Sequence, residues 1–206
     1  MDLKTTDSNR RHFLKGMAMG AGALALGSSL INPLEVMGQS IEASLGKASM
    51  EFRWSMASIG NVFHSVNFYK SLVNSGGREK LLDFNKKQSF AGGGRQKGIV
   101  DQLGLTGNDP KSAAEMIAVL FTLYNGPKSK FEITGASANK ANLKCVECPI
   151  WNMIQSQKIT DDLCSGLSIY YWDGFVKALN PKIASSLVKA RPLGDSFCEL
   201  AIELQA

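Results

Sequence analysis

Cysteine is the residue type in this chain best suited to chemistry, and all four cysteines fall in one stretch near the C-terminus. Cys145 and Cys148 lie in the segment KCVECP, Cys164 in DDLCSG, and Cys198 in GDSFCEL. Thiolates bind metals and act as nucleophiles, and paired thiols form disulfides. These positions therefore predict a metal site, a nucleophile or two disulfides, and the spacing alone leaves all three open.

The C-x-x-C spacing of Cys145 and Cys148 is only weak evidence for zinc or redox chemistry here. The pair falls at the end of a predicted strand over 142–147, where residues three apart point to opposite faces. Pro149 can end that strand at Cys148, which would let both thiols reach one site. We expect Cys145 to lie on the opposite face and to matter least.

Cys164 is the strongest candidate for a reactive thiol. A helix capped by Thr160 or Asp161 is predicted to begin just before it, which places Cys164 in the first turn. The unpaired amides and the dipole of a helix N-terminus stabilise a thiolate and lower its pKa. Cys164 is therefore predicted to be a nucleophile or a metal ligand.

Cys198 alternates in phase with Leu200 and is predicted to face the core. We expect Cys148, Cys164 and Cys198 to be neighbours in space, as catalytic thiols or as ligands of zinc or another metal ion. Adding Cys145 would close the set as a structural metal site or allow an iron–sulfur cluster. Each cysteine taken alone is equally well explained as an inert core residue.

The remaining composition excludes several functions. The net charge of +5, from 23 basic and 18 acidic residues, is too small to indicate nucleic-acid binding. His64 is the one histidine after the N-terminal segment, and a lone histidine on a helix is typical of packing or surface positions. No Ser-His-Asp arrangement is evident.

The N-terminus indicates export. Arg10 and Arg11 stand in SNRRHFLK, which is followed by 16 small or apolar residues, GMAMGAGALALGSSLI. This order resembles a twin-arginine signal, so we predict a signal peptide over 1–38, the twin-arginine translocase as a partner during export, and a periplasmic protein. The apolar run is short and rich in Gly and Ala, so membrane attachment is expected only if the signal stays uncleaved.

The first part of the predicted domain, 39–206, reads as helical over 47–125. Apolar residues recur every three or four positions over 51–74, which predicts a helix with one apolar stripe: Phe52, Met56, Ile59, Phe63, Val66, Tyr69 and Val73. Shorter helices are predicted over 81–90, 95–103 and 112–123, the last opened by a capping box of Ser112 and Glu115. The glycines at 92–94 predict a flexible hinge.

The period of apolar residues changes from about 3.6 to two after Lys130. Strands are predicted over 131–135, 142–147, 184–190 and 197–204, with a helix between the second and third. The sequence therefore predicts an α+β fold in which N-terminal helices precede a ββαββ unit with an antiparallel sheet over 130–206.

These motifs together resemble the L-2-amino-thiazoline-4-carboxylic acid hydrolase-like family. The resemblance covers 92–204 and lies in LGLTGND at 103–109, the hairpin ending at Cys148-Pro149, Cys164, and GDSFC at 194–198. The related 4-vinyl-reductase ligand-binding domains are similar in plan. The resemblance implies that Cys148, Cys164 and Cys198 carry the family's cysteine pattern and that a thiazoline ring is opened by hydrolysis. Cys145 is additional, and Glu147 stands where many members have arginine.

Three functions follow as hypotheses. The first is an exported hydrolase acting on C–N or C–S bonds of a small heterocycle, through a thiol or a metal-activated water. The second is a binding module for a small molecule, whose apolar pocket aromatic residues would line. The third is a small exported domain held by two disulfides. The aromatic candidates for the pocket are Phe131, Trp151, Tyr170, Tyr171 and Trp172.

Overall fold

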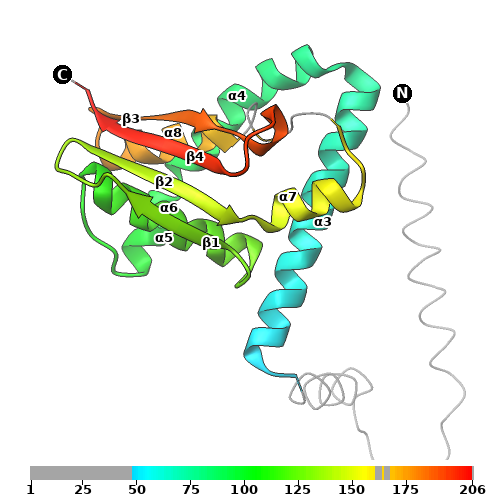
Figure 1. Cartoon of the computed structure of the whole chain (residues 1–206), viewed down its shortest axis with the longest axis horizontal. Coiled ribbons are helices and arrows are strands. Elements are labelled where there is room, and N and C mark those ends of the chain that lie inside the picture. The colour runs from blue at the N-terminus through cyan, green and yellow to red at the C-terminus, as the bar shows by residue number, and fades with distance from the viewer. Residues whose placement is uncertain (1–47, 161–163, 165–167, 206) are drawn as a thin grey trace, which may run out of the picture. The chain divides into compact units, whose positions relative to one another are not determined.

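A computed structural model describes residues 48–160, 164 and 168–205, and Ser49–Ala206 forms one compact unit. The predicted signal peptide over 1–38 and the predicted cap Asp161 lie outside the described residues. The fold is α+β as predicted, with helices first and a four-stranded antiparallel sheet after them (Figure 1).

Six helices and four strands have the following bounds in the described part of the chain. The helices are α3 (Met50–Gly76), α4 (Arg78–Gly94), α5 (Lys97–Gln102), α6 (Pro110–Asn125), α7 (Pro149–Ser156) and α8 (Ser168–Leu179). The strands are β1 (Lys130–Thr134), β2 (Lys140–Glu147), β3 (Ile183–Lys189) and β4 (Cys198–Leu204), in the spatial order β1-β2-β4-β3. A 3-10 turn, η1 (Arg191–Leu193), joins β3 to β4. The predicted ββαββ unit did not include α7, a helix of eight residues that lies between β2 and α8.

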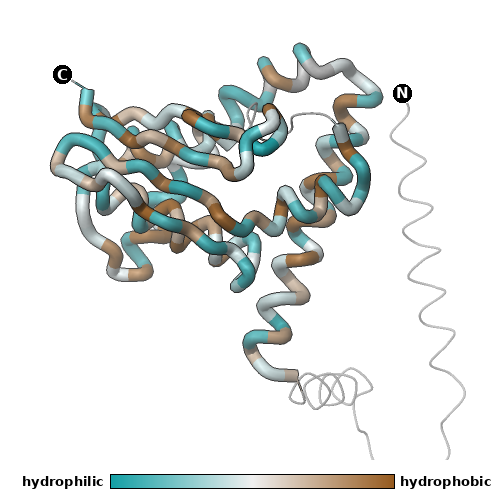
Figure 2. Tube along the Cα trace, viewed as in Figure 1, coloured by the Kyte–Doolittle hydropathy of each residue, from teal (hydrophilic) through white to brown (hydrophobic). Residues whose placement is uncertain are grey.

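The core lies between one face of the sheet and helices α6 and α8. Side chains with almost no exposure meet there, including Ile117 and Leu120 from α6, Phe175 from α8 and Ile202 from β4. Apolar and polar residues alternate along the strands (Figure 2), which is the pattern of a sheet with one buried and one solvated face. The alternation explains why strand positions were predictable.

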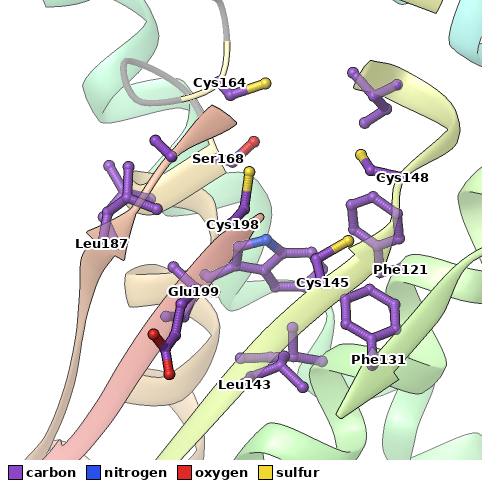
Figure 3. Close-up of a pocket in the computed structure, with 16 residues that line it drawn as sticks. Phe121, Phe131, Leu143, Cys145, Cys148, Cys164, Ser168, Leu187, Cys198 and Glu199 are labelled. Atoms are coloured by element: carbon purple, nitrogen blue, oxygen red, sulfur yellow. The ribbon is translucent and has the colours of Figure 1, made fainter. Parts of the chain in front are cut away.

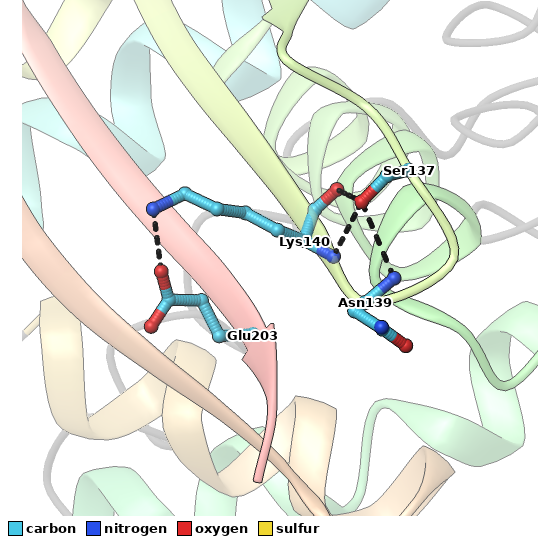
Figure 4. Close-up of polar contacts among 4 residues, drawn as sticks. All are labelled: Ser137, Asn139, Lys140 and Glu203. Atoms are coloured by element: carbon cyan, nitrogen blue, oxygen red, sulfur yellow. Dashed lines mark hydrogen bonds and ion pairs between the residues drawn. The ribbon is translucent and has the colours of Figure 1, made fainter.

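The β1–β2 hairpin is closed by a polar turn and tied to β4. The Ser137 hydroxyl accepts hydrogen bonds from the amides of Asn139 and Lys140 (Figure 4). The Lys140 ammonium pairs with Glu203, its register partner on β4. The turn and the ion pair together fix the register of the two central strands.

Helices α4 and α8 approach so closely that backbone meets backbone. A Cβ added to Gly93 would lie 1.8 Å from the carbonyl oxygen of Tyr171, and one added to Gly174 would lie 2.0 Å from that of Phe90. Gly93 lies inside α4, which continues through all three glycines to Gly94. The predicted flexible hinge at 92–94 is therefore wrong, because these glycines serve close helix packing.

Helix α3 has the predicted bounds but presents a different face to the protein. Its buried residues are Ser58, Val62 and Val66, whereas half or more of the surface of four residues of the predicted stripe is exposed: Phe52, Met56, Ile59 and Phe63. The first half of the stripe is therefore turned to solvent, whereas Val66 is buried and Tyr69 and Val73 pack against the same cluster as Val66. None of the helices in the described part of the chain is long and apolar enough to cross a membrane.

Helix α6 begins with a cap other than the predicted one. The Asp109 carboxylate accepts hydrogen bonds from the amides of Lys111 and Ser112, and Pro110 occupies the first turn. The predicted capping box of Ser112 and Glu115 is therefore wrong, because an aspartate before proline is the stronger helix start. At the other end, Trp54 and Asn61 of α3 donate to carbonyls of Leu123 and Tyr124.

Candidate functional site

All four cysteines line one cavity between the sheet and α8 (Figure 3). They come from four places in the fold: Cys145 from β2, Cys148 from the N-terminus of α7, Cys164 from the turn before α8, and Cys198 from the start of β4. The cavity has a volume of about 70 Å³. Most of the other lining residues are apolar, among them Phe121, Phe131, Leu143, Trp172 and Leu200.

Cys145 faces this cavity, contrary to the prediction that it lies on the opposite face of its strand. It is buried in phase with Ala141 and Leu143 of β2. The pairing of β2 with β1 shifts at Val146, which has no partner between the pairs Lys130–Glu147 and Phe131–Cys145. Such a β-bulge interrupts the alternation of faces. The chain after it therefore brings Cys148 back to the same cavity as Cys145.

Cys148 lies at the N-terminus of a helix, α7, which is the kind of position that was predicted for Cys164. Its sulfur caps α7 by accepting a hydrogen bond from the Trp151 amide at 3.4 Å. Hydrogen bonding with the Cys145 thiol, assisted by the helix amides, lowers the pKa of Cys148 to about 7 against the opposing effect of burial. The same hydrogen bond and burial raise the pKa of Cys145. Cys148 is therefore the thiol of this pair that ionises first.

Arg191 is a member of the site that the sequence did not single out. Its Nη2 donates to the carbonyl of Val146 at 2.6 Å, and its backbone amide donates to the Cys198 sulfur at 3.4 Å. Its positive charge opposes the rise in the pKa of Cys145 and contributes to the lowered pKa of Cys148. Arg191 thus ties the end of β2 to the β3–β4 connection and favours a thiolate in the cavity.

That Cys164 lies in the first turn of a helix stays a prediction, because residues 161–163 and 165–167 are outside the described part of the chain. Cys164 lies in a turn four residues before Ser168, the first described residue of α8. Its carbonyl accepts a hydrogen bond from the Ser168 amide at 3.0 Å, which is the i to i+4 pattern of an α-helix. Thr160 lies outside any helix.

A wider cavity of about 410 Å³ adjoins the first and reaches α3. Five residues border both cavities: Phe121, Ile150, Cys164, Ser168 and Trp172. Of the five predicted aromatic residues, Phe131 and Trp172 line the first cavity and Tyr171 lines the second. Trp151 lies at a separate pocket, and Tyr170 packs below the Lys86 ammonium. Phe121 was missed because its helix was assigned no role in a site.

The thiols are close together but are not arranged as a metal centre. No group of three or more His, Cys, Asp or Glu side chains among residues 48–160, 164 and 168–205 is placed to hold a metal ion. The arrangement of the thiols therefore gives no support to the zinc site or the iron–sulfur cluster considered from the sequence. No disulfide joins the four cysteines, all of which lie in the described part of the chain. His64 is exposed on α3.

Cys148 is expected to be the fastest thiol to react with iodoacetamide. A pKa near 7 instead of 9.0 raises the thiolate fraction at pH 7 about fiftyfold, while the lower basicity reduces nucleophilicity roughly eightfold, leaving a net gain of about sixfold. The rate should rise tenfold per pH unit below pH 7 and level off above it. Peptide mass spectrometry over a pH series measures it. A fast phase that survives in Cys148→Ser, or is lost in Cys164→Ser, contradicts the assignment.

Comparison with known proteins identifies the export signal and the fold. The family model for the TAT (twin-arginine translocation) pathway signal sequence matches residues 7–27, which indicates export across the cytoplasmic membrane. The match is confined to that segment, so the thiazoline hydrolase-like family is not shown. No curated protein matches the chain.

Two solved structures share the fold. The phenol-responsive sensory domain of the transcription activator PoxR, crystallised with phenol, aligns with a TM-score of 0.54 and 16% identity over 69% of this chain and 74% of that one. Trafficking protein particle complex subunit 3 from Naegleria fowleri, covalently bound to palmitic acid, aligns with a TM-score of 0.54 and 18% identity over 71% of this chain and 96% of that one. At these identities the likeness shows the α+β fold alone.

Proposed function

We propose that the chain is an exported binding module that takes a small, mainly apolar molecule into the two adjoining cavities. The observation that carries this proposal is the apolar lining of the cysteine cavity, where Phe121, Phe131 and Trp172 surround the four thiols. Ligand sites of this kind are mostly apolar, with a few polar groups that fix the orientation of the ligand. Here the thiols and Ser168 supply those polar groups.

The volumes indicate how a ligand would be seated. A cavity of about 150 Å³ holds a benzene molecule, so the cysteine cavity of about 70 Å³ is too small for a whole ring. The adjoining cavity of about 410 Å³ lies within the usual range for small-molecule sites. We therefore infer that the body of the ligand occupies the wider cavity and that one end reaches the thiols past Ser168 and Trp172.

Two considerations support a ligand of this class. The structures that share the fold include one with phenol and one with palmitic acid attached covalently, and both molecules are largely apolar. The wider cavity also has polar groups at its α3 side, including Asn61 and Tyr69. A ligand with an apolar body and one hydroxyl or carboxyl group matches that lining.

Ligand binding is expected to quench the fluorescence of Trp172, which borders both cavities. Phenol and octanoate serve as probes, titrated by fluorescence and by calorimetry. Ser168→Phe fills the junction of the cavities and is expected to raise the Kd at least tenfold. Ser186→Phe, at an exposed position on β3, is the matched control and should leave the Kd unchanged. Failure of both probes to bind the wild-type protein at millimolar concentration would overturn the proposal.

A second candidate function is the hydrolysis of a small heterocycle, with Cys148 as the nucleophile. The observation that favours it is the lowered pKa of Cys148, whose thiolate would be available as a nucleophile in the cavity. In this hypothesis Cys164 and Cys198 position the substrate. Release of more than one equivalent of product from 2-amino-thiazoline-4-carboxylate, lost in Cys148→Ala, would distinguish an enzyme from a binding module.

We further propose that the protein works in the periplasm, with the twin-arginine translocase as its partner during export. The signal at residues 7–27 supports this location. The translocase is expected to carry the domain in its folded state, so the cavities would be formed before export.

A further inference from the structure

Cys145 and Cys198 stand directly opposite each other in the sheet. They are Cα partners in the antiparallel register of β2 and β4, the two central strands. Opposite residues in such a pair have Cα atoms about 4.5 to 5.5 Å apart and point to the same face. Disulfides span Cα separations of about 4.4 to 6.8 Å. The register alone therefore places this pair within bridging distance.

The strand register distinguishes this pair from the other combinations. Both side chains line the same cavity (Figure 3), and the Arg191 amide donates to the Cys198 sulfur. Cys148 lies one residue beyond the end of β2 and has no partner on β4. Its thiol contacts that of Cys145 through a hydrogen bond, but the two residues are not register partners. Cys164 lies outside the sheet altogether. The strand ladder thus fixes one cysteine pair and leaves the other two thiols on connecting segments.

We propose that Cys145 and Cys198 form a reversible cross-strand disulfide once the protein reaches an oxidising compartment. The oxidant is a disulfide, either of a small molecule such as oxidised glutathione or of an oxidised dithiol protein. One of the two cysteine thiolates attacks the oxidant, forms a mixed disulfide with it and releases one thiol. The other cysteine thiolate then attacks the mixed disulfide, forms the Cys145–Cys198 bond and releases the second thiol of the oxidant. Both electrons and both protons pass to the oxidant, which becomes two thiols.

The disulfide would join the two central strands where they line the cysteine cavity. It would close a loop running from Cys145 to Cys198, which contains α7, α8 and β3. Closing a long loop removes conformational freedom from the unfolded chain and so stabilises the fold. Cys148 would remain a thiol, so the cavity would keep one nucleophile in either state. None of this depends on the ligand proposed above.

The test begins with the wild-type protein, incubated with oxidised glutathione or dithiothreitol and then alkylated. Peptide mapping of the oxidised sample is expected to show the Cys145–Cys198 linkage with Cys148 and Cys164 alkylated. The melting temperature is expected to be on the order of 10 °C higher than in the reduced sample. Cys164→Ser is the control and should give the same linkage and the same shift in melting temperature. The peptide mapping uses the wild-type protein, so the test holds even if Cys145→Ser or Cys198→Ser fails to fold.

Three outcomes would overturn the proposal. The first is a linkage that involves Cys148 or Cys164 in place of one of the two strand cysteines. The second is complete alkylation of Cys145 and Cys198 after oxidation. The third is a bound metal that protects all four thiols in the purified protein, measured by elemental analysis before and after addition of a chelator.

Discussion

Replacing Arg10 and Arg11 together by lysine is expected to keep the protein in the cytoplasm. Both residues fall inside the segment matched by the twin-arginine signal model, residues 7–27. The double lysine variant keeps the charge of the pair but removes the planar guanidinium groups, which lysine does not replace in specific recognition. Cell fractionation and immunoblotting measure the periplasmic fraction, which is expected to fall from most of the protein to near zero.

The control for export removes a charge without touching the arginine pair. Lys4→Gln lowers the charge of the N-terminal segment by one and should leave export unchanged. Wild-type levels of the double lysine variant in the periplasm would show that the pair is not the export determinant. The same conclusion would follow if the wild-type protein were exported in cells that lack the translocase.

Replacing Gly93 or Gly174 by alanine is expected to lower the free energy of unfolding by roughly 3 to 5 kcal/mol. The added methyl carbon would lie 1.8 Å from the Tyr171 carbonyl oxygen in one case and 2.0 Å from the Phe90 carbonyl oxygen in the other. These contacts are with backbone, which cannot turn aside as a side chain would. Helices α4 and α8 would therefore have to separate, which opens the core around Phe175. Urea denaturation measures the loss.

Gly60→Ala is the matched control for this prediction. Gly60 also lies within a helix, but it is exposed and no atom lies within 4 Å of an added Cβ. Alanine there is expected to raise the free energy of unfolding by about 0.5 to 1 kcal/mol, because it restricts the unfolded chain and favours the helix. Equal and small effects at all three glycines would show that α4 and α8 do not meet through their backbones.

The strands could be predicted from the sequence because one face of the sheet is exposed to solvent. Side chains then alternate between water and core with a period of two, and the four predicted strands agree with β1 to β4 within two residues. Short helices were harder to predict. The eight residues of α7 give too few turns for a helical period, and Pro149 was taken as the end of a strand and not as the start of a helix.

Which face of an element is buried depends on partners that a single segment does not reveal. In α3 the apolar period gave the helix but the wrong face for its first half, since the protein buries Ser58 and leaves Phe63 exposed. For Cys145 the rule of alternating faces failed because the bulge at Val146 arises from the pairing of β2 with β1. A helix beginning at Pro149 was not evident from the sequence, so the helix N-terminal position of Cys148 was missed.

The close contact of α4 and α8 also bears on how the proposed ligand would enter and leave the cavities. Because the two backbones touch at Gly93 and Gly174, α8 has no room to shift toward α4, and the cavity wall that it forms is rigid. The walls formed by α3 and α7 meet through side chains such as Val66 and Ile154. The proposed ligand is therefore expected to enter from that side, with its passage governed by side-chain rotations instead of by slow helix displacement.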